Sequence, residues 1–123
     1  MTLTMLDLQK LKDPSLYDCN LVDNLKGGKG TCEVYTKKNP DASYTSEGVI
    51  CMMAVNGIYP SIGKHQHIND EETYTVIYGI FEVNGIMLMP GHSMTCKMGK
   101  SHNAQLISEN GALQFQKRLP SAA

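Results

Sequence analysis

Arginine and long apolar segments are the scarcest features of this sequence. The chain of 123 residues contains a single arginine, Arg118, and its 11 Lys+Arg are balanced by 12 Asp+Glu, for a net charge of -1. Proteins that bind nucleic acid usually carry a basic surplus, so no nucleic-acid partner is expected. No apolar run approaches the ~20 residues of a membrane-spanning helix, so no membrane partner is expected either. The N-terminus also lacks the basic and apolar segments of a secretion signal, which makes the cytoplasm the expected location.

Paired cysteine motifs are absent as well, although the chain contains four cysteines. Cys19, Cys32, Cys51 and Cys96 are spread along the sequence without a CxxC pair. Four cysteines could form two disulfides, but disulfides are typical of secreted proteins, and no secretion signal is visible. We therefore expect free thiols that behave as small buried apolar residues.

The length predicts one domain, and turn residues divide most of it into short strands. The apolar and β-branched segments between the turns are 31–36, 49–55, 73–81, 86–89, 104–107 and 112–115. Asn84-Gly85 predicts a tight hairpin, and Glu109-Asn110-Gly111 predicts a second Asn-Gly turn. Short strands at even spacing indicate an all-β fold over residues 30–119, either an antiparallel sandwich or a barrel.

The first 29 residues differ from this pattern, and we interpret them as an N-terminal arm that ends in a Gly-rich turn. The leucines of the arm could form a short helical turn, but their spacing indicates neither helix nor strand; they are Leu3, Leu6, Leu8 and Leu11. Residues 26–30 contain three glycines but lack the Lys-[ST] of a phosphate-binding loop, so a turn before a strand is expected. Residues 120–123 are interpreted as a C-terminal tail.

Three of the four histidines form a pattern with a carboxylate. His65 and His67 are two residues apart, so both imidazoles would face the same way on a strand. Glu72 opens the next strand, and His102 follows after the hairpin, where an antiparallel strand can return beside the first. Three imidazoles and one carboxylate suit Fe, Mn, Ni, Zn or Co, and leave open positions for water or a chelating substrate. The HxH pair alone is weak evidence; the full set predicts one divalent transition metal ion.

The spacing around these residues resembles the two motifs of the cupin superfamily. The first motif, G-x5-H-x-H-x3,4-E-x6-G, is matched at His65, His67, Glu72 and Gly79, with Tyr59 in place of the leading glycine. The second motif, G-x5-P-x-G-x2-H-x3-N, is matched at Gly91, Gly99 and His102. Lys97 stands in its proline position and Leu106 in its asparagine position. These departures lie outside the ligand set.

The resemblance implies a small jelly-roll β-barrel, commonly dimeric, in which His65, His67, Glu72 and His102 bind the metal. A homodimer is therefore expected, and the leucines of the arm would supply apolar surface for it. The alternative for the whole constellation is a cupin barrel that has lost its metal. Glu71 is the alternative carboxylate because the family tolerates three or four residues at that point, but only Glu72 keeps the six-residue spacing to Gly79. His92 matches no ligand position and is interpreted as a solvated turn residue.

Strand alternation predicts what surrounds the metal. Counting from Glu72 places Tyr74, Val76 and Tyr78 on its face of the strand, and counting from His102 places Ala104 and Leu106 beside the third histidine. Met52 or Met53 could enter from the preceding strand. Tyr74 and Tyr78 are the candidate catalytic residues, which would orient a substrate or donate a proton; the alternative is that both pack in the core.

Two functions from different classes are compatible with this pattern. The first is a metal-dependent enzyme acting on a small polar or sugar-like molecule, of isomerase, epimerase, lyase or dioxygenase type. The second is a non-catalytic cupin that binds or senses a small ligand. A complete ligand set with open coordination positions favours the enzyme, and neither the metal nor the reaction follows from the sequence.

Overall fold

The computed structural model describes residues 9–21, 30–40, 44–66 and 71–118, with the backbone alone for residues 63–66. A 3-10 helix, η1 (Gln9–Lys12), precedes ten strands. The strands are β1 (Tyr17–Leu21), β2 (Thr31–Lys37), β3 (Tyr44–Met53), β4 (Ser61–Gln66), β5 (Glu71–Tyr78), β6 (Phe81–Val83), β7 (Ile86–Leu88), β8 (Ser93–Cys96), β9 (Ser101–Leu106) and β10 (Asn110–Arg118). No helix within these ranges is long and apolar enough to cross a membrane.

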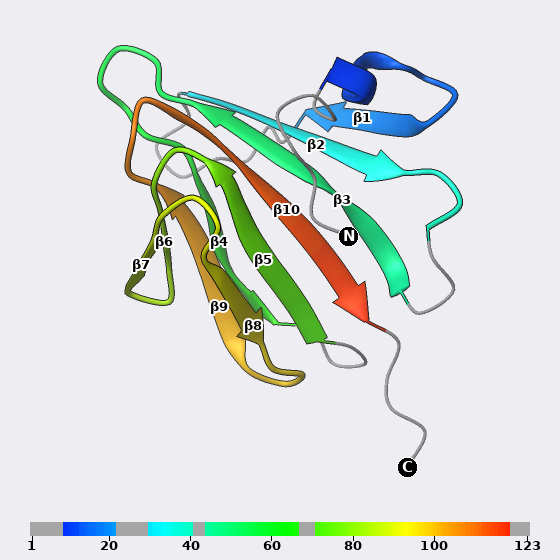
Figure 1. Ribbon diagram of the computed structural model, residues 1–123. Coiled ribbons are helices and arrows are strands. Elements are labelled where there is room, and N and C mark those ends of the chain that lie inside the picture. Colours follow the sequence, from blue (N-terminus) through cyan, green and yellow to red (C-terminus); the bar gives the residue numbers. More distant parts are fainter. Residues whose placement is uncertain (1–8, 22–29, 41–43, 67–70, 119–123) are drawn as a thin grey trace.

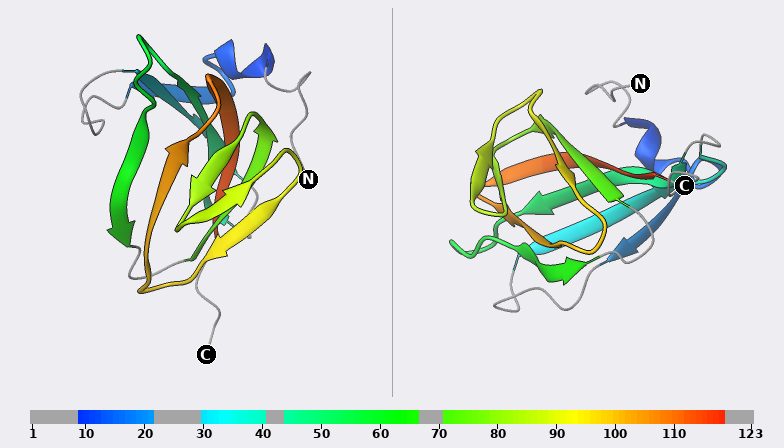
Figure 2. Two further views of the ribbon diagram at one scale, coloured as in Figure 1. Left: turned by 90° about the vertical axis from the view of Figure 1, so that its left-hand side faces the viewer. Right: turned by 90° about the horizontal axis from the view of Figure 1, so that it is seen from below.

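The strands form two antiparallel sheets that pack face to face (Figures 1 and 2). The larger sheet has the order β1-β2-β3-β10-β5-β8, and the smaller sheet has the order β4-β9-β6-β7. The chain crosses between the sheets repeatedly after β3, so segments distant in sequence become neighbours. The all-β prediction is confirmed, with one difference: the two sheets are not closed into a continuous barrel.

The main core lies between the two sheets. Along β5, alternate residues are buried, and these are Glu72, Tyr74 and Val76. Ala104 and Leu106 of β9 are buried in the same core, as alternation predicted. The choice between the two methionines of β3 is also resolved, since Met52 is buried in the core and Met53 is exposed.

A second apolar cluster lies on the outer face of the larger sheet. It combines the helix and the first strand with β2, β3 and β10, through Leu11, Tyr17, Tyr35, Val49 and Ala112. Strand β1 was not predicted from the sequence, because its segment YDCNL has no clear alternation of polar and apolar residues. This strand forms because its backbone pairs with β2 along its whole length.

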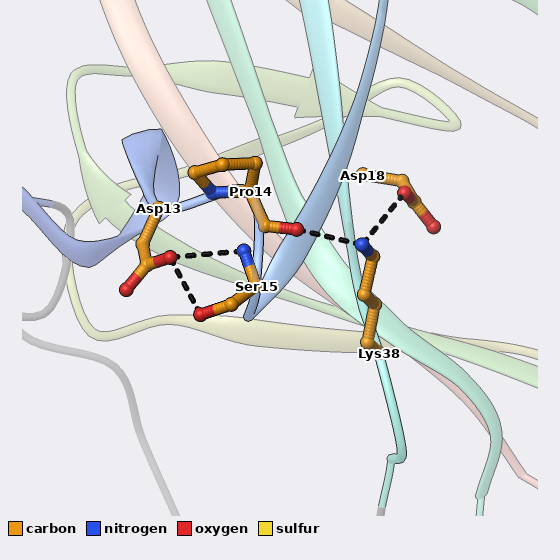
Figure 3. A network of polar contacts seen from close by, with 5 residues as sticks. All are labelled: Asp13, Pro14, Ser15, Asp18 and Lys38. Carbon is orange, nitrogen blue, oxygen red and sulfur yellow. Dashed lines mark hydrogen bonds and ion pairs between the residues drawn. The ribbon is translucent and has the colours of Figure 1, made fainter.

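A polar network fastens the segment before β1 to the end of β2 (Figure 3). The Lys38 ammonium donates to the Pro14 carbonyl at 2.6 Å and lies 3.6 Å from the Asp18 carboxylate. Asp13 accepts hydrogen bonds from the backbone amide and the hydroxyl of Ser15, which closes the turn after η1. These contacts hold the segment between η1 and β1 against the end of β2. Of the predicted arm, Leu3, Leu6, Leu8 and residues 26–29 lie outside the described ranges, as does the predicted tail.

The two Asn-Gly turn predictions had different outcomes. Asn84 and Gly85 have φ angles of 51° and 80° and join β6 to β7, as expected for a two-residue hairpin. The second prediction was wrong, because Asn110 and Gly111 belong to β10. A Cβ on Gly111 would lie 2.6 Å from the Phe81 ring, so this glycine serves close packing within a strand.

All four cysteines are free thiols, as predicted. Burial raises the pKa of Cys32 to about 12 and that of Cys51 to about 11. Cys32 and Cys96 are buried, as expected, and Cys51 is half-buried. Cys19 is exposed on β1, so the expectation of a buried thiol was wrong at that position.

Candidate metal centre

Glu72 and His102 meet between the two sheets. Glu72 is the second residue of β5 in the larger sheet, and His102 is the second residue of β9 in the smaller one. The Nε2 atom of His102 lies 2.9 Å from Oε1 of Glu72. The two residues are 0% and 3% exposed, so the pair is shielded from solvent although 30 residues separate its members.

The backbone of β4 brings a second histidine position to the same place. His65 is the register partner of His102 in the antiparallel pairing of β4 with β9. His67, the other histidine of the predicted set, lies outside the described residues. Within the part of the chain that the structure describes, no group of three or more His, Cys, Asp or Glu side chains converges. Of the predicted set, the described side chains that meet are therefore Glu72 and His102.

Tyr74 packs against this pair. Its ring meets the His102 ring edge to face, with 5.8 Å between the centroids and an interplanar angle of 71°. Burial, followed by the charge of Glu72 and a hydrogen bond to it, raises the pKa of Tyr74 well above its usual value. The hydroxyl therefore stays protonated at neutral pH and can donate a hydrogen bond.

Tyr78 does not share this environment, which corrects the prediction from alternation. Tyr78 is the register partner of Ala112, while Val76 is the partner of Leu113, so a bulge adds one residue to β5 between them. The extra residue turns Tyr78 to the outer cluster, where it packs with Ala112 and Cys51. Sequence counting missed this change of face because bulges carry no fixed residue signature.

The other predicted positions near the site are resolved by burial. Glu71 is half-buried and precedes Glu72 on a strand whose residues alternate between faces, so only Glu72 reaches His102. His92 is exposed in a turn, where its Nδ1 atom accepts a hydrogen bond from the Met89 amide at 3.1 Å. His92 thus takes the turn role that was predicted for it.

Two neighbours of Glu72 were missed by the sequence analysis. Cys96 of β8 and Lys117 of β10 are its register partners on either side. Burial, with a smaller effect of the Glu72 charge, raises the pKa of Cys96 to about 11, so this thiol is protonated at neutral pH. Strand alternation could have placed Lys117 on the inner face of β10, because the core residues Leu113 and Phe115 precede it at steps of two.

The glycines of the two motifs have structural causes independent of any metal. Gly79 has a φ angle of 81°, and a Cβ there would lie 2.4 Å from the Asn110 carbonyl oxygen. Gly99 has a φ angle of 77° in the turn between β8 and β9, directly before the strand that carries His102. Both glycines therefore permit the chain reversals that place β5 and β9.

The described pair fits a transition metal ion in donor type and separation. Imidazole nitrogen and carboxylate oxygen are ordinary ligands of such ions, at bond lengths of about 2.0–2.2 Å. Two donors at right angles around one ion would then be about 3.0 Å apart, close to the 2.9 Å between His102 Nε2 and Glu72 Oε1. The separation also equals that of a direct hydrogen bond, so it is compatible with a metal without requiring one.

Comparison with known proteins gives structural similarity without sequence similarity. No family model matches the sequence, and no curated protein matches it either. Among solved structures, a predicted oxalate decarboxylase from Thermotoga maritima superposes with a TM-score of 0.68 at 20% identity, covering 85% of this chain and 95% of the other.

Two further structures show the range of proteins with this architecture. The Cnp3 cupin domain of Schizosaccharomyces pombe has a TM-score of 0.61 at 13% identity, covering 83% of this chain and 69% of the other. KdgF from Halomonas sp. has a TM-score of 0.52 at 17% identity, covering 83% and 88% respectively. Identities this low establish the fold alone. The two-sheet topology and these superpositions together show that the chain has the cupin superfamily fold.

Proposed function

We propose that this protein is a small metal-dependent enzyme that acts on a small polar or sugar-like molecule. In this proposal His65, His67, Glu72 and His102 bind one divalent transition metal ion. The observation that supports it is the buried contact between Glu72 and His102, which joins two sheets at the position where β4 also brings His65. A buried carboxylate–imidazole pair gains little stability over apolar residues of the same volume, so its presence in the core favours a functional role.

The bound ion would act as a Lewis acid toward a hydroxyl, carbonyl or carboxylate oxygen of the substrate. The surrounding residues would exclude water, because Val76, Leu106 and Phe115 are all buried in the same core. Tyr74 would hold Glu72 in place through its protonated hydroxyl and pack against the His102 ring. Tyr74 is therefore a positioning residue in this proposal, and it is a candidate proton donor once substrate is bound.

The structural relatives support either of the two function classes. The similarity to a predicted oxalate decarboxylase favours an enzyme. A Drosophila melanogaster CENP-C structure bound to CAL1 also matches, with a TM-score of 0.59 at 16% identity, and this similarity favours the binding module. Metal content separates the two classes for this chain, because a non-catalytic binding module does not need a complete ligand set.

The test compares ligand variants with matched controls on this same chain. His102→Ala and His67→Ala should abolish stoichiometric metal binding while far-UV circular dichroism still shows a β fold. His92→Ala removes an exposed histidine outside the set and should keep the wild-type metal content. Glu72→Gln should reduce the metal content far more than Glu71→Gln. Wild-type metal content in His102→Ala, or the reverse ranking of the two glutamates, would overturn the assignment.

The proposal includes a cytoplasmic homodimer. Leu11 is already buried within one chain, so the proposed interface would use the other leucines of the arm, Leu3, Leu6 and Leu8. Deleting the first eight residues removes these three and keeps Leu11. Light scattering should therefore show a dimer for the full chain and a weaker dimer for the truncated one. A monomer at tens of micromolar would contradict the dimer. An unchanged dimer after truncation would contradict the role of the arm in it.

A further inference from the structure

Lys117 lies on the inner face of the larger sheet, beside the candidate metal centre. Leu113 and Phe115 are both buried in the main core, so strand alternation puts Lys117 on the same face. The pairing of β10 with β5 sets Lys117 directly opposite Glu72, the residue that reaches His102. Directly opposed residues have Cβ atoms about 4.5–5.5 Å apart, so Lys117 is an immediate neighbour of the carboxylate ligand.

The charge of Lys117 is not matched within the described part of the chain. Its side chain is half-buried, and no carboxylate among the described residues lies within ion-pair distance of it. Lys37, on the outer face of the same sheet, is different because its ammonium lies 3.9 Å from the Glu47 carboxylate. A half-buried ammonium group without an internal anion is suited to bind an external one.

We propose that Lys117 binds the negatively charged end of the substrate, so that the substrate class is a small carboxylate. This inference rests on the proposed function, because the remaining oxygens of the same molecule would bind at the ion held by Glu72 and His102. Lys117 is then the residue that selects an anionic compound over a neutral one. Arg118, the lone arginine, does not compete for this role, since its guanidinium lies over the Tyr44 ring at 5.9 Å.

The experiment uses malonate as the anionic probe and glycerol as the neutral probe, in calorimetric titrations of the metal-loaded full chain. Malonate should bind more tightly than glycerol, and Lys117→Met should weaken malonate binding by about tenfold or more. The metal content of Lys117→Met should equal that of the wild type, and Lys37→Met should keep wild-type malonate binding.

Each other outcome refutes a specific statement. Equal malonate binding by Lys117→Met and the wild type, or no preference for malonate over glycerol in metal-loaded protein, overturns the role of Lys117 alone. Wild-type protein that takes up no metal overturns the proposed function, and the role of Lys117 with it. The metal-to-protein ratio measured on each titrated sample distinguishes these results.

A second inference concerns the three Asn-Gly sequences of the chain, which the structure places in different environments. Asn110-Gly111 lies in strand β10, where the Phe81 ring packs against Gly111. Asn84-Gly85 forms the hairpin between β6 and β7. Asn56-Gly57 forms a hairpin closed by mutual hydrogen bonds between Val55 and Ile58, neither of which uses the Gly57 amide.

The two hairpin asparagines differ in how their side chains are held. The Oδ1 atom of Asn84 accepts a hydrogen bond from the Asn103 amide at 3.2 Å, and its Nδ2 donates to the Ser101 carbonyl at 3.3 Å. Asn56 is exposed, makes no side-chain hydrogen bond to the described residues, and is followed by a glycine with open space around it. The Asn56 side chain can therefore reach the next backbone amide without breaking a contact.

We infer that Asn56 is a site of spontaneous deamidation, whereas Asn84 and Asn110 are protected in the folded chain. The Gly57 amide nitrogen attacks Cγ of Asn56, the bond from Cγ to Nδ2 breaks, and ammonia leaves, forming a cyclic succinimide. Water then opens the ring to aspartate or isoaspartate. The product places a new carboxylate at the hairpin tip, close to Tyr59 and Glu109, which line the same surface pocket.

Peptide mass mapping after incubation of the folded full chain at mildly alkaline pH tests this inference. The Asn56 peptide should gain the mass of amide-to-acid conversion about tenfold or more faster than the Asn84 peptide, because the latter must break two hydrogen bonds. In guanidinium chloride the three sequences should react at similar rates. Equal rates at Asn56 and Asn84 in the folded chain, or an Asn56 peptide that stays unmodified while the denatured chain reacts, would overturn it.

Discussion

Replacing His102 by alanine tests whether the Glu72–His102 contact is as buried as the structure indicates. His102 is 0% exposed and Glu72 is 3% exposed. The substitution removes the imidazole whose Nε2 atom lies 2.9 Å from the Glu72 carboxylate. Loss of a buried side chain of this size costs about 2–4 kcal/mol, by analogy with other large-to-small core substitutions. Leaving the Glu72 carboxylate with one partner fewer adds about 1–3 kcal/mol.

The expected total, about 3–7 kcal/mol, is a large part of the ~5–15 kcal/mol that stabilises a typical domain. At about 4 °C per kcal/mol for a chain of this size, the melting temperature should fall by roughly 12–28 °C. The assay is denaturant unfolding followed by circular dichroism with a chelator present, so that a bound metal makes no contribution. His92→Ala is the control, and should stay within about 0.5 kcal/mol of the wild type because that residue is exposed.

A double-mutant cycle with Glu72→Gln separates the two contributions. The neutral glutamine has no charge to leave unpaired, so His102→Ala should cost about 1–2 kcal/mol less in that background. The reasoning is refuted if His102→Ala leaves the unfolding free energy within about 0.5 kcal/mol of the wild type. Strict additivity of the two substitutions would refute the contact between them.

Three further outcomes are expected. In the folded protein a thiol reagent at neutral pH should modify the exposed Cys19 first and the half-buried Cys51 more slowly, and all four thiols should react after denaturation; fast modification of Cys32 or Cys96 would contradict their burial. Because burial raises the pKa of Cys32 from 9.0 to about 12, this thiol favours the folded state below pH 9 and loses that effect as the pH rises toward 12. The unfolding free energy should therefore fall between pH 9 and pH 12, less steeply in Cys32→Ala than in the wild type. The same pH dependence in both proteins would show that Cys32 does not contribute to it. Gly111→Ala should destabilise the protein by about 1–3 kcal/mol, because its Cβ would lie 2.6 Å from the Phe81 ring; unchanged stability would show that the ring is free to move.

The sequence predicted the features that follow from local rules. Strand alternation gave the buried positions Tyr74, Ala104 and Leu106, and the Asn84-Gly85 dipeptide gave the β6–β7 hairpin. Both depend on the residue itself and on its near neighbours, which a single sequence contains. The cupin resemblance likewise depended on short spacings, and the fold it implied was confirmed by the superpositions.

Features that depend on distant partners were not predictable in this way. The bulge in β5 turns Tyr78 outward because of its pairing with β10, and Gly111 is a glycine because the Phe81 ring occupies the space of a side chain. Strand β1 forms through pairing with β2, although its own sequence gives no strand signal. Each of these errors came from tertiary pairing that overrides local pattern.

The pH dependence of metal release would extend the test of the site. In the proposed site, protons would compete with the ion for the imidazoles of His65, His67 and His102, and a free histidine titrates near ~6.5. Since metal binding stabilises the neutral form, the bound state should be full above neutrality and be lost as the pH falls through about 6 to 4, with more than one proton taken up per ion released. Release by a single proton would indicate a site with fewer histidines.

The most direct measurement for the proposed metal centre is the metal content of wild-type protein, purified without chelators and without a metal-affinity column. The account predicts about one divalent transition metal ion per chain, and a chelator at pH 7.5 that removes the ion should lower the melting temperature by the same increment that added metal restores. Protein that contains no ion, and whose melting temperature responds neither to chelator nor to added divalent metal, would contradict it.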